Sequence, residues 1–285
     1  MQFAFILLAI VACLAGFVIL MVHIGFRAPR IRETGTPQQF QLDYAEVDIP
    51  ARQGAHLFGW LLPVKDSTKT IILLHGWGGN AEMMLPLARP FIAAGINVLL
   101  IDSRNHGRSD RGAISSMPRF AEDADSAIDY LQKNHHDMAQ KIALLGHSVG
   151  AGAVLLAASR RKDINAVISI SAFAHPDRMM RRFLAGKRIP RPIISAILNY
   201  VQWIIGARFE QIAPMHTICR QSCPVLLVHG KADSTIPVDD ARDILRNCPD
   251  RAVELVEIDG ADHDSVELIE QHAHQLTDFL RRNAF

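Results

Sequence analysis

The chain opens with an unbroken apolar run. From Phe3 to Val22 every residue is apolar or small, and the run contains no charge and no proline. As a helix, twenty residues rise about 30 Å, which is the thickness of the hydrocarbon core of a bilayer. A helix on a soluble core would show a polar face, and this run has none. The pattern predicts an N-terminal transmembrane helix that anchors the chain over residues 3–24.

A cleaved signal peptide is the main alternative for this run. The basic residues that should precede its apolar part are missing, and the run exceeds the usual length of about 7–15 residues. Ile10-Val11-Ala12-Cys13 is similar to a lipoprotein processing site, but apolar residues continue well past Cys13. These features favour an uncleaved anchor.

Charge and cysteine content bear on the orientation of this anchor. Arg27, Arg30 and Arg32 follow the run, whereas only the amino terminus is charged ahead of it, and this asymmetry favours a cytoplasmic location for the rest of the chain. Four cysteines are too few for a disulfide scaffold, so we interpret all four as thiols. Reduced thiols favour the same side of the membrane.

Beyond a polar linker over residues 25–41, the hydrophobic pattern becomes that of strands. Leu42–Ile49 and His56–Pro63 predict an antiparallel pair. Six short, continuous apolar runs follow, which are typical of strands buried on both faces. They are Thr70–Leu74, Ile96–Ile101, Ile142–Leu145, Ala166–Ser171, Val225–Val228 and Val253–Ile258.

Helical stretches separate these strands. They are Ala81–Ala94, Pro118–Asn134, Val149–Arg160, Pro237–Asn247 and Ser265–Arg282. Strand–helix alternation implies right-handed crossovers and a mostly parallel central sheet flanked by helices. Residues 42–285 are therefore predicted to form one α/β domain.

One connection is too long for a simple crossover. About fifty residues, 172–224, separate two predicted strands. We expect two or three helices here, forming a lid insertion over the strand ends; an extra helical layer with no gating role is the alternative. The segment is also basic, with Arg178, Arg181, Arg182, Lys187, Arg188 and Arg191.

Composition removes several classes of function. Of the 285 residues, 49% are apolar and 21% charged, which excludes a disordered chain. Thirty Lys and Arg against 29 Asp and Glu leave a net charge of +1, so no basic field exists to hold a nucleic acid, and none is expected as a partner.

The pentapeptide Gly146-His147-Ser148-Val149-Gly150 lies between a predicted strand and a predicted helix. A serine on such a sharp turn is held in a strained backbone, and the flanking glycines permit the close approach of neighbouring chain. The helix N-terminus stabilises negative charge formed beside it. The pattern predicts that Ser148 is a nucleophile.

A serine hydroxyl needs a base to take its proton and an acid to orient that base. Asp233 and His263 follow the strands Val225–Val228 and Val253–Ile258, in the chain order serine, acid, histidine. Open α/β sheets collect their sites at these strand ends. Three other acids share the loop of the histidine and are set aside: Asp259, Asp262 and Asp264.

The glycine-rich run His75-Gly76-Trp77-Gly78-Gly79 follows another strand and can aim backbone amides at an oxyanion. We expect the amides of Trp77 and Val149 to be the donors, and His75 to brace the loop. No residues show the spacing of a metal site or a nucleotide-binding loop, so no metal and no cofactor is expected.

With these motifs, residues from about Tyr44 to Phe285 resemble the α/β-hydrolase superfamily. A further stretch, Asp102–Ser109, is similar to the D-x-R-G-H-G-x-S run of that family, with Asn105 in place of a glycine. The resemblance implies the α/β-hydrolase fold and the same roles for the triad and oxyanion residues. It is nearest to the serine esterase, acylglycerol lipase and related peptidase branches.

The leading interpretation is a membrane-anchored serine hydrolase that cleaves carboxylic esters, including lipid esters, through an acyl-enzyme. Its partners would be a small ester or lipid substrate and, through the N-terminal helix, the bilayer. A serine peptidase or amidase of the same fold is the first alternative. A non-catalytic ligand-binding protein is the second.

Overall fold

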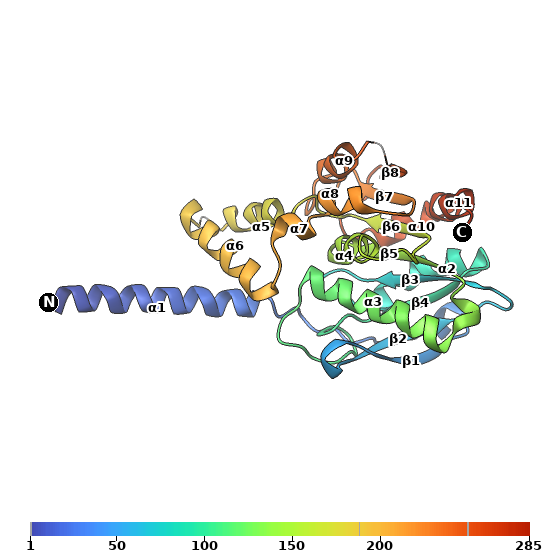
Figure 1. Ribbon diagram of the computed structural model, residues 1–285, viewed down its shortest axis with the longest axis horizontal. Coiled ribbons are helices and arrows are strands. Elements are labelled where there is room, and N and C mark those ends of the chain that lie inside the picture. Colours follow the sequence, from blue (N-terminus) through green and yellow to red (C-terminus); the bar gives the residue numbers. More distant parts are fainter. Residues whose placement is uncertain (1, 188, 250) are drawn as a thin grey trace.

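The computed structural model describes residues 2–187, 189–249 and 251–285, without the side chains of residues 4, 7, 11, 14 and 15. Its centre is an eight-stranded sheet in the order β1-β2-β4-β3-β5-β6-β7-β8 (Figure 1). The strands are β1 (Ala45–Pro50), β2 (His56–Leu62), β3 (Lys69–Leu74), β4 (Asn97–Ile101), β5 (Lys141–His147), β6 (Ala166–Ile170), β7 (Val225–Gly230) and β8 (Val253–Ile258).

The direction of the strands agrees with the sequence pattern. β2 pairs antiparallel with β1 and with β4, whereas the remaining neighbours, from β4 to β8, are parallel. Every residue of β4, β6 and β7 is buried, as a sheet covered on both faces requires. The predicted mostly parallel sheet is confirmed.

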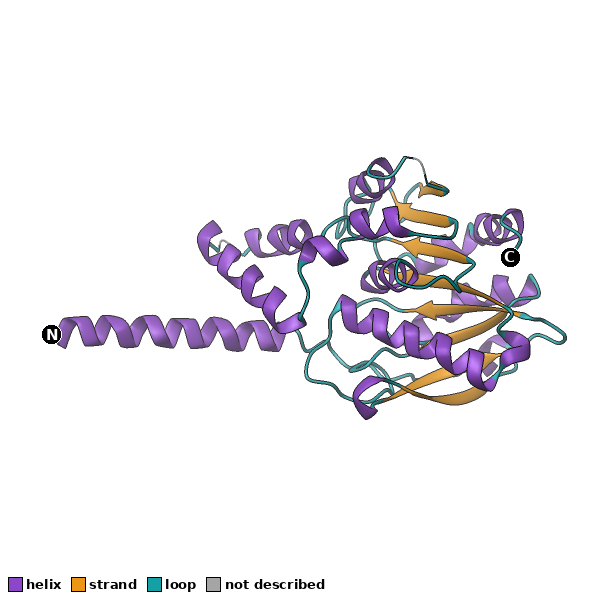
Figure 2. Cartoon of the chain, in the orientation of Figure 1, coloured by secondary structure: helices purple, strands orange, loops and turns teal. Residues whose placement is uncertain are grey.

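Helices cover both faces of the sheet (Figure 2). Side chains of β3 alternate between them: Ile72 and Leu74 belong to the same core as Phe120 of α3, while Ile71 and Leu73 belong to the core on the opposite face. The flanking helices are α2 (Leu85–Ala93), α3 (Met117–Asn134), α4 (Val149–Ala158), α9 (Asp239–Arg246), α10 (Val266–Gln271) and α11 (Ala273–Arg282), and short 3₁₀ turns lie at Pro37–Phe40, Arg52–Gly54, Glu82–Met84, His136–Met138 and Ile218–Arg220.

The single helix predicted over Ser265–Arg282 is wrong in one respect. It is broken at His272, where φ −99° and ψ 12° leave the helical region between α10 and α11. Apolar positions continue on both sides of the break and pack into one core, so the hydrophobic period does not reveal it.

The long insertion forms helices beside the carboxyl ends of the parallel strands (Figures 1 and 2). They are α5 (Pro176–Ala185), α6 (Arg191–Ile205), α7 (Phe209–Ile212) and α8 (Pro214–Thr217). Arginines of α5 pair with carboxylates: Arg178 with Asp243 at 2.9 Å, Arg181 with Asp177 at 2.6 Å, and Arg182 with Asp240 at 2.7 Å. Arg188 lies outside the described residues.

The apolar N-terminal run is one helix, α1 (Gln2–Gly25), which projects away from the sheet (Figure 1). Among the described residues, no helix combines the length and the hydrophobicity needed to cross a bilayer. The predicted transmembrane anchor is therefore not supported by the fold.

The expected linker over residues 25–41 lies against the domain. The Arg30 Nε donates to the Gly107 carbonyl at 2.8 Å, and the Asn80 side chain donates to the Ile31 carbonyl at 3.2 Å. The backbone amides of Thr34 and Gly35 donate to the carboxylate of a residue in the domain, Glu82, at 2.7 and 2.9 Å. The segment is thus bound along its length.

The interpretation of all four cysteines as thiols is wrong. Cys219 and Cys248 form a disulfide with Cα atoms 5.4 Å apart, while Cys13 and Cys223 are free. The two bonded residues lie 29 positions apart in sequence, and the packing of α8 against α9 brings them together. The argument from reduced thiols for a cytoplasmic domain therefore loses its basis.

Candidate active site

Ser148 occupies a sharp turn between β5 and α4. Its φ of 55° and ψ of −115° lie in a region that non-glycine residues rarely adopt. The two neighbouring glycines are sterically required: a Cβ on Gly146 would collide with the Gly150 carbonyl, and a Cβ on Gly150 would lie 2.5 Å from the His75 carbonyl oxygen. The turn therefore presents the serine at the strand end.

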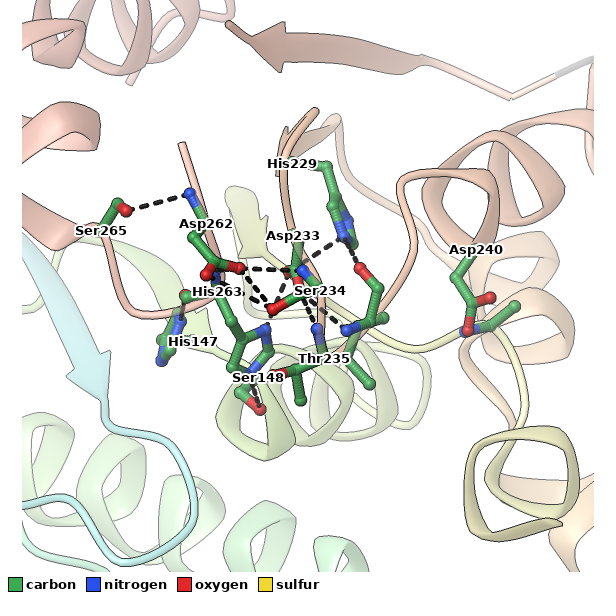
Figure 3. Close-up of polar contacts among 12 residues, drawn as sticks. His147, Ser148, His229, Asp233, Ser234, Thr235, Asp240, Asp262, His263 and Ser265 are labelled. Carbon is green, nitrogen blue, oxygen red and sulfur yellow. Dashed lines mark hydrogen bonds and ion pairs between the residues drawn. The ribbon is translucent and has the colours of Figure 1, made fainter. Parts of the chain in front are cut away.

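Three predicted residues meet at this point (Figure 3). The Ser148 Oγ lies 2.9 Å from the His263 Nε2, and the His263 Nδ1 lies 2.8 Å from the Asp233 Oδ2. Asp233 follows β7 and His263 follows β8, two adjacent parallel strands. Both histidine contacts are satisfied when Nδ1 carries the proton and Nε2 accepts one from the serine.

The Asp233 carboxylate is buried and held from several directions. Its Oδ1 accepts hydrogen bonds from the backbone amides of Thr235 at 3.0 Å and Ile236 at 2.7 Å. The His229 Nε2 lies 3.3 Å from its Oδ2. Burial alone would raise the pKa of Asp233, but the hydrogen bonds from His229, His263 and the Ile236 amide lower it well below the ordinary value. The carboxylate is therefore ionised.

The ionised carboxylate changes the basicity of its neighbour. Burial would lower the pKa of His263, but the hydrogen bond and the negative charge of Asp233 outweigh burial and raise that pKa above its ordinary value of 6.5. A more basic imidazole takes a proton from a hydroxyl more readily. The geometry and the charges suit proton transfer from Ser148.

The predicted oxyanion loop lies directly beside the serine. A Cβ on Gly76 would lie 3.0 Å from the His147 Nδ1 and 3.3 Å from the Ser148 Cβ, so any larger residue would crowd the serine turn. Among the hydrogen bonds of the described residues, the amides of Trp77 and Val149 have no acceptor. Val149 is also the first residue of α4, where the helix dipole favours an anion.

His75 braces this loop, as the sequence predicts. It is fully buried, and its Nε2 accepts a hydrogen bond from the Ser103 amide at 3.1 Å. Burial, helped by the nearby His106, lowers its pKa to about 3, so the ring stays neutral.

Sequence reasoning missed two supports of the triad. Asp262, set aside as a loop acid, accepts hydrogen bonds from the Ser234 amide and from the His263 amide, each at 2.8 Å, and so ties the two catalytic loops together. The His147 Nε2 lies 2.8 Å from the His263 carbonyl. Their adjacency to predicted site residues was the only signal available.

A large apolar cavity opens beside Ser148. Its volume is about 790 Å³, and α1, α5 and α6 contribute half of its lining residues, which also include Trp77 and Val149. This volume lies within the range of about 300–1,000 Å³ that is typical of small-molecule sites.

Two groups of side chains come close enough to share a metal ion. The first group is His147, His263 and Asp264. Both ring nitrogens of His263 already contact other side chains, those of Asp233 and Ser148. In the second, His175 and His216 lie on either side of the Glu210 carboxylate, at 3.3 and 3.2 Å. Each of these two rings also places its Nδ1 near a backbone group.

A family model, Hydrolase_4, described as serine aminopeptidase S33, matches residues 65–221, more than half of the chain. The chain belongs to this family. The match begins ahead of β3 and takes in the oxyanion loop, the Ser148 turn and the lid insertion. This Hydrolase_4 protein thus has the α/β fold of a hydrolase family.

Relatives of this Hydrolase_4 protein come from bacteria and yeast. The uncharacterized protein YqkD of Bacillus subtilis is 30% identical over 202 residues, which span 70% of this chain and 66% of the relative. The uncharacterized membrane protein YNL320W of Saccharomyces cerevisiae is 22% identical over 88% of this chain and 84% of its own length.

Among solved structures, the Pyrococcus furiosus esterase Pf2001 is similar in fold. Its TM-score is 0.74 at 23% identity, and the match covers 91% of this chain and 98% of the esterase chain. The predicted α/β-hydrolase fold is confirmed by this likeness.

Proposed function

We propose that the protein is a serine hydrolase of carboxylic esters. Ser148 attacks the acyl carbon while His263 takes its proton, and Asp233 holds the imidazole and stabilises its positive charge. The amides of Trp77 and Val149 stabilise the oxyanion. His263 returns the proton to the departing alcohol, and water then hydrolyses the acyl-enzyme. The hydrogen-bonded chain Ser148–His263–Asp233 carries this proposal.

A peptidase or amidase is the competing function, and the family description includes aminopeptidases. An acidic side chain is the strongest partner for the ammonium group of an aminopeptidase substrate. Among the described residues that line the cavity, none is acidic, and Lys187 is the one that is charged. The lining therefore favours an ester with an apolar acyl group.

A fluorophosphonate probe and two substrate panels test this function. The probe should label the protein, and Ser148→Ala should abolish labelling. We expect p-nitrophenyl esters to be hydrolysed at least about a hundredfold faster than aminoacyl p-nitroanilides. Absence of labelling would indicate a non-catalytic protein, whereas faster cleavage of the anilides would indicate a peptidase.

Membrane association is a second part of the proposal. Large apolar side chains along α1 are exposed, among them Phe3, Phe5, Leu8 and Leu20. Lipid would cover such a surface at a lower free-energy cost than water does. The membrane protein YNL320W among the relatives supports this location. After cell lysis we expect the protein in the membrane pellet; recovery in the supernatant would contradict this location.

The side of the membrane on which the domain lies rests on charge alone. Arg27, Arg30 and Arg32 follow α1 and favour a cytoplasmic domain. Digestion by an external protease of intact and permeabilised cells measures this. We expect the domain to be degraded only after permeabilisation.

A further inference from the structure

The N-terminal helix α1 forms part of the cavity beside Ser148. Phe17, Val18, Met21 and Val22 line this cavity, so one face of its last two turns forms a wall. The opposite wall comes from the lid insertion, where the lining residues include Met179, Met180 and Ile197. The N-terminal helix and the lid helices therefore enclose one space.

Contacts hold α1 in this position. Val22 is only 9% exposed and belongs to the same hydrophobic core as Ile197 and Leu198 of α6. The His23 Nε2 lies 2.9 Å from the Tyr200 hydroxyl. Just after α1, the ring of Phe26 packs edge-on against the ring of Trp77 in the oxyanion loop, with centroids 6.3 Å apart. The C-terminal end of α1 is thus a fixed part of the site.

The mouth of the cavity is largely apolar as well. Large apolar lining residues remain exposed there: Phe17, Met21 and Ile24 on α1, and Phe183 on α5. Two polar lining residues, Lys187 and Thr235, are also exposed. On α1 the exposed apolar surface continues from this mouth toward the N-terminus through Leu8 and other large side chains. A site for a polar, freely dissolved substrate would instead have a polar rim.

The volume sets a scale for the ligand. A water molecule takes about 30 Å³, and a methylene group takes a similar volume, so an acyl chain of twelve to sixteen carbons needs roughly 350–500 Å³. The cavity of about 790 Å³ accepts such a chain together with the ester group. An acetyl group would leave most of this apolar space unfilled.

We infer that the site is specific for esters of long-chain, apolar acyl groups, and that the C-terminal half of α1 is a specificity-determining wall rather than only a tether. The inference rests on the proposed serine hydrolase function. The acyl chain enters between α1 and the lid helices and lies against Val18 and Val22, with its carbonyl carbon at the Ser148 Oγ. Lipid esters are the matching substrate class.

Filling the cavity from α1 tests this inference. The full-length protein in detergent is assayed with p-nitrophenyl dodecanoate and p-nitrophenyl acetate. The wild type should have at least about a tenfold higher kcat/KM for the dodecanoate. Val22→Trp should lower the ratio of the two kcat/KM values at least about tenfold. Because Val22 is buried and its variant could fold poorly, Val18→Trp is measured in parallel and should have the same effect.

The matched control is Ile19→Trp on the same helix. Ile19 is exposed and is not among the cavity-lining residues, so its variant should change the ratio by less than about twofold. Fluorophosphonate labelling rates report whether each variant keeps an intact Ser148 turn.

The outcomes separate the inference from the function on which it rests. If the wild type neither labels nor cleaves the acetate, the proposed function fails. If the wild type cleaves the acetate but not the dodecanoate, the inference alone is overturned. It is also overturned if Val18→Trp lowers both activities equally or leaves the ratio unchanged. A selective loss of dodecanoate hydrolysis supports it.

Discussion

The two sides of the site are built differently. On the catalytic side, the serine, acid and base lie on loops that directly follow β5, β7 and β8, and hydrogen bonds donated by backbone amides hold each loop. On the acyl side, three helices enclose the cavity through side-chain packing. Within the described residues, the contact of His23 with Tyr200 is the polar link between α1 and α6.

This difference suggests separate roles for the two sides. The strand-end loops position the reacting groups, and the helices set the choice of substrate. Ladder hydrogen bonds of a buried sheet hold strand ends to within a fraction of an ångström, as a triad requires. Helices held by apolar packing can exchange side chains of similar volume at modest cost. We therefore expect substitutions on the catalytic side to change turnover, and those on the acyl side to change the choice of substrate.

The largest expected effect is on the catalytic side. Ser148→Ala should reduce ester turnover at least about a thousandfold, because it removes the covalent route. The fold should survive, since alanine is smaller than serine. Steady-state kinetics and thermal melting measure the two quantities; retained turnover would contradict the assignment of the nucleophile.

A similar but smaller loss is expected for the acid. Asp233→Asn should lower kcat about a hundredfold to a thousandfold, because an amide leaves His263 in the wrong tautomer. It also changes the pH profile. His263 acts as a base only when neutral, so wild-type kcat/KM should rise with pH through a midpoint above 6.5, since Asp233 raises that pKa.

In Asp233→Asn the rise of kcat/KM with pH, the acidic limb of the profile, should have its midpoint at lower pH. The reason is that the negative charge that raises the pKa of His263 is gone. Asp259→Asn is the matched control, since Asp259 pairs with Lys231 at 2.8 Å on the protein surface. Its profile should coincide with that of the wild type. An unshifted limb in Asp233→Asn would show that another group titrates there.

On the acyl side, a milder variant sharpens the comparison. Tyr200→Phe removes the hydroxyl that contacts His23 and leaves the ring in place. One such hydrogen bond is worth about 1 kcal/mol, so kcat/KM for the dodecanoate should fall by about two- to fivefold. Hydrolysis of the acetate should change less. An equal loss on both esters would mean that this contact supports the triad.

The smallest expected effect concerns the stability of the folded protein and its dependence on pH. Asp102 is buried near the oxyanion loop, and burial together with the carboxyl of Glu33 raises its pKa to about 8. Because the folded pKa exceeds the unfolded value, the folded state should lose stability as pH rises toward 8. Glu33→Gln should flatten this loss, as thermal melting at pH 6 and pH 8 would measure.

Much of the catalytic side follows from sequence because its signals are local. A strand, a glycine turn and a helix are contiguous around Ser148, and Asp233 and His263 each follow a recognisable strand. The structure brings these three within hydrogen-bonding distance; their roles stay predictions until tested.

The remaining features depend on contacts between distant segments. The Cys219–Cys248 disulfide, the tie from Asp262 to the loop of Asp233, and the packing of α1 against α6 join residues whose spacing carries no pattern. The apolar run of α1 is uniform around the helix, so no period distinguishes the face that lines the cavity.

The path of the segment after α1 decides how this protein should be shortened for production. Phe26 packs against Trp77, and Pro29 lies so close to Gly78 that a Cβ there would be 2.9 Å from its Cγ. A chain trimmed at residue 31 would lose both contacts and the hydrogen bonds of Arg30. Such a trimmed form would have an altered oxyanion loop, so its kinetics would not represent those of the whole enzyme.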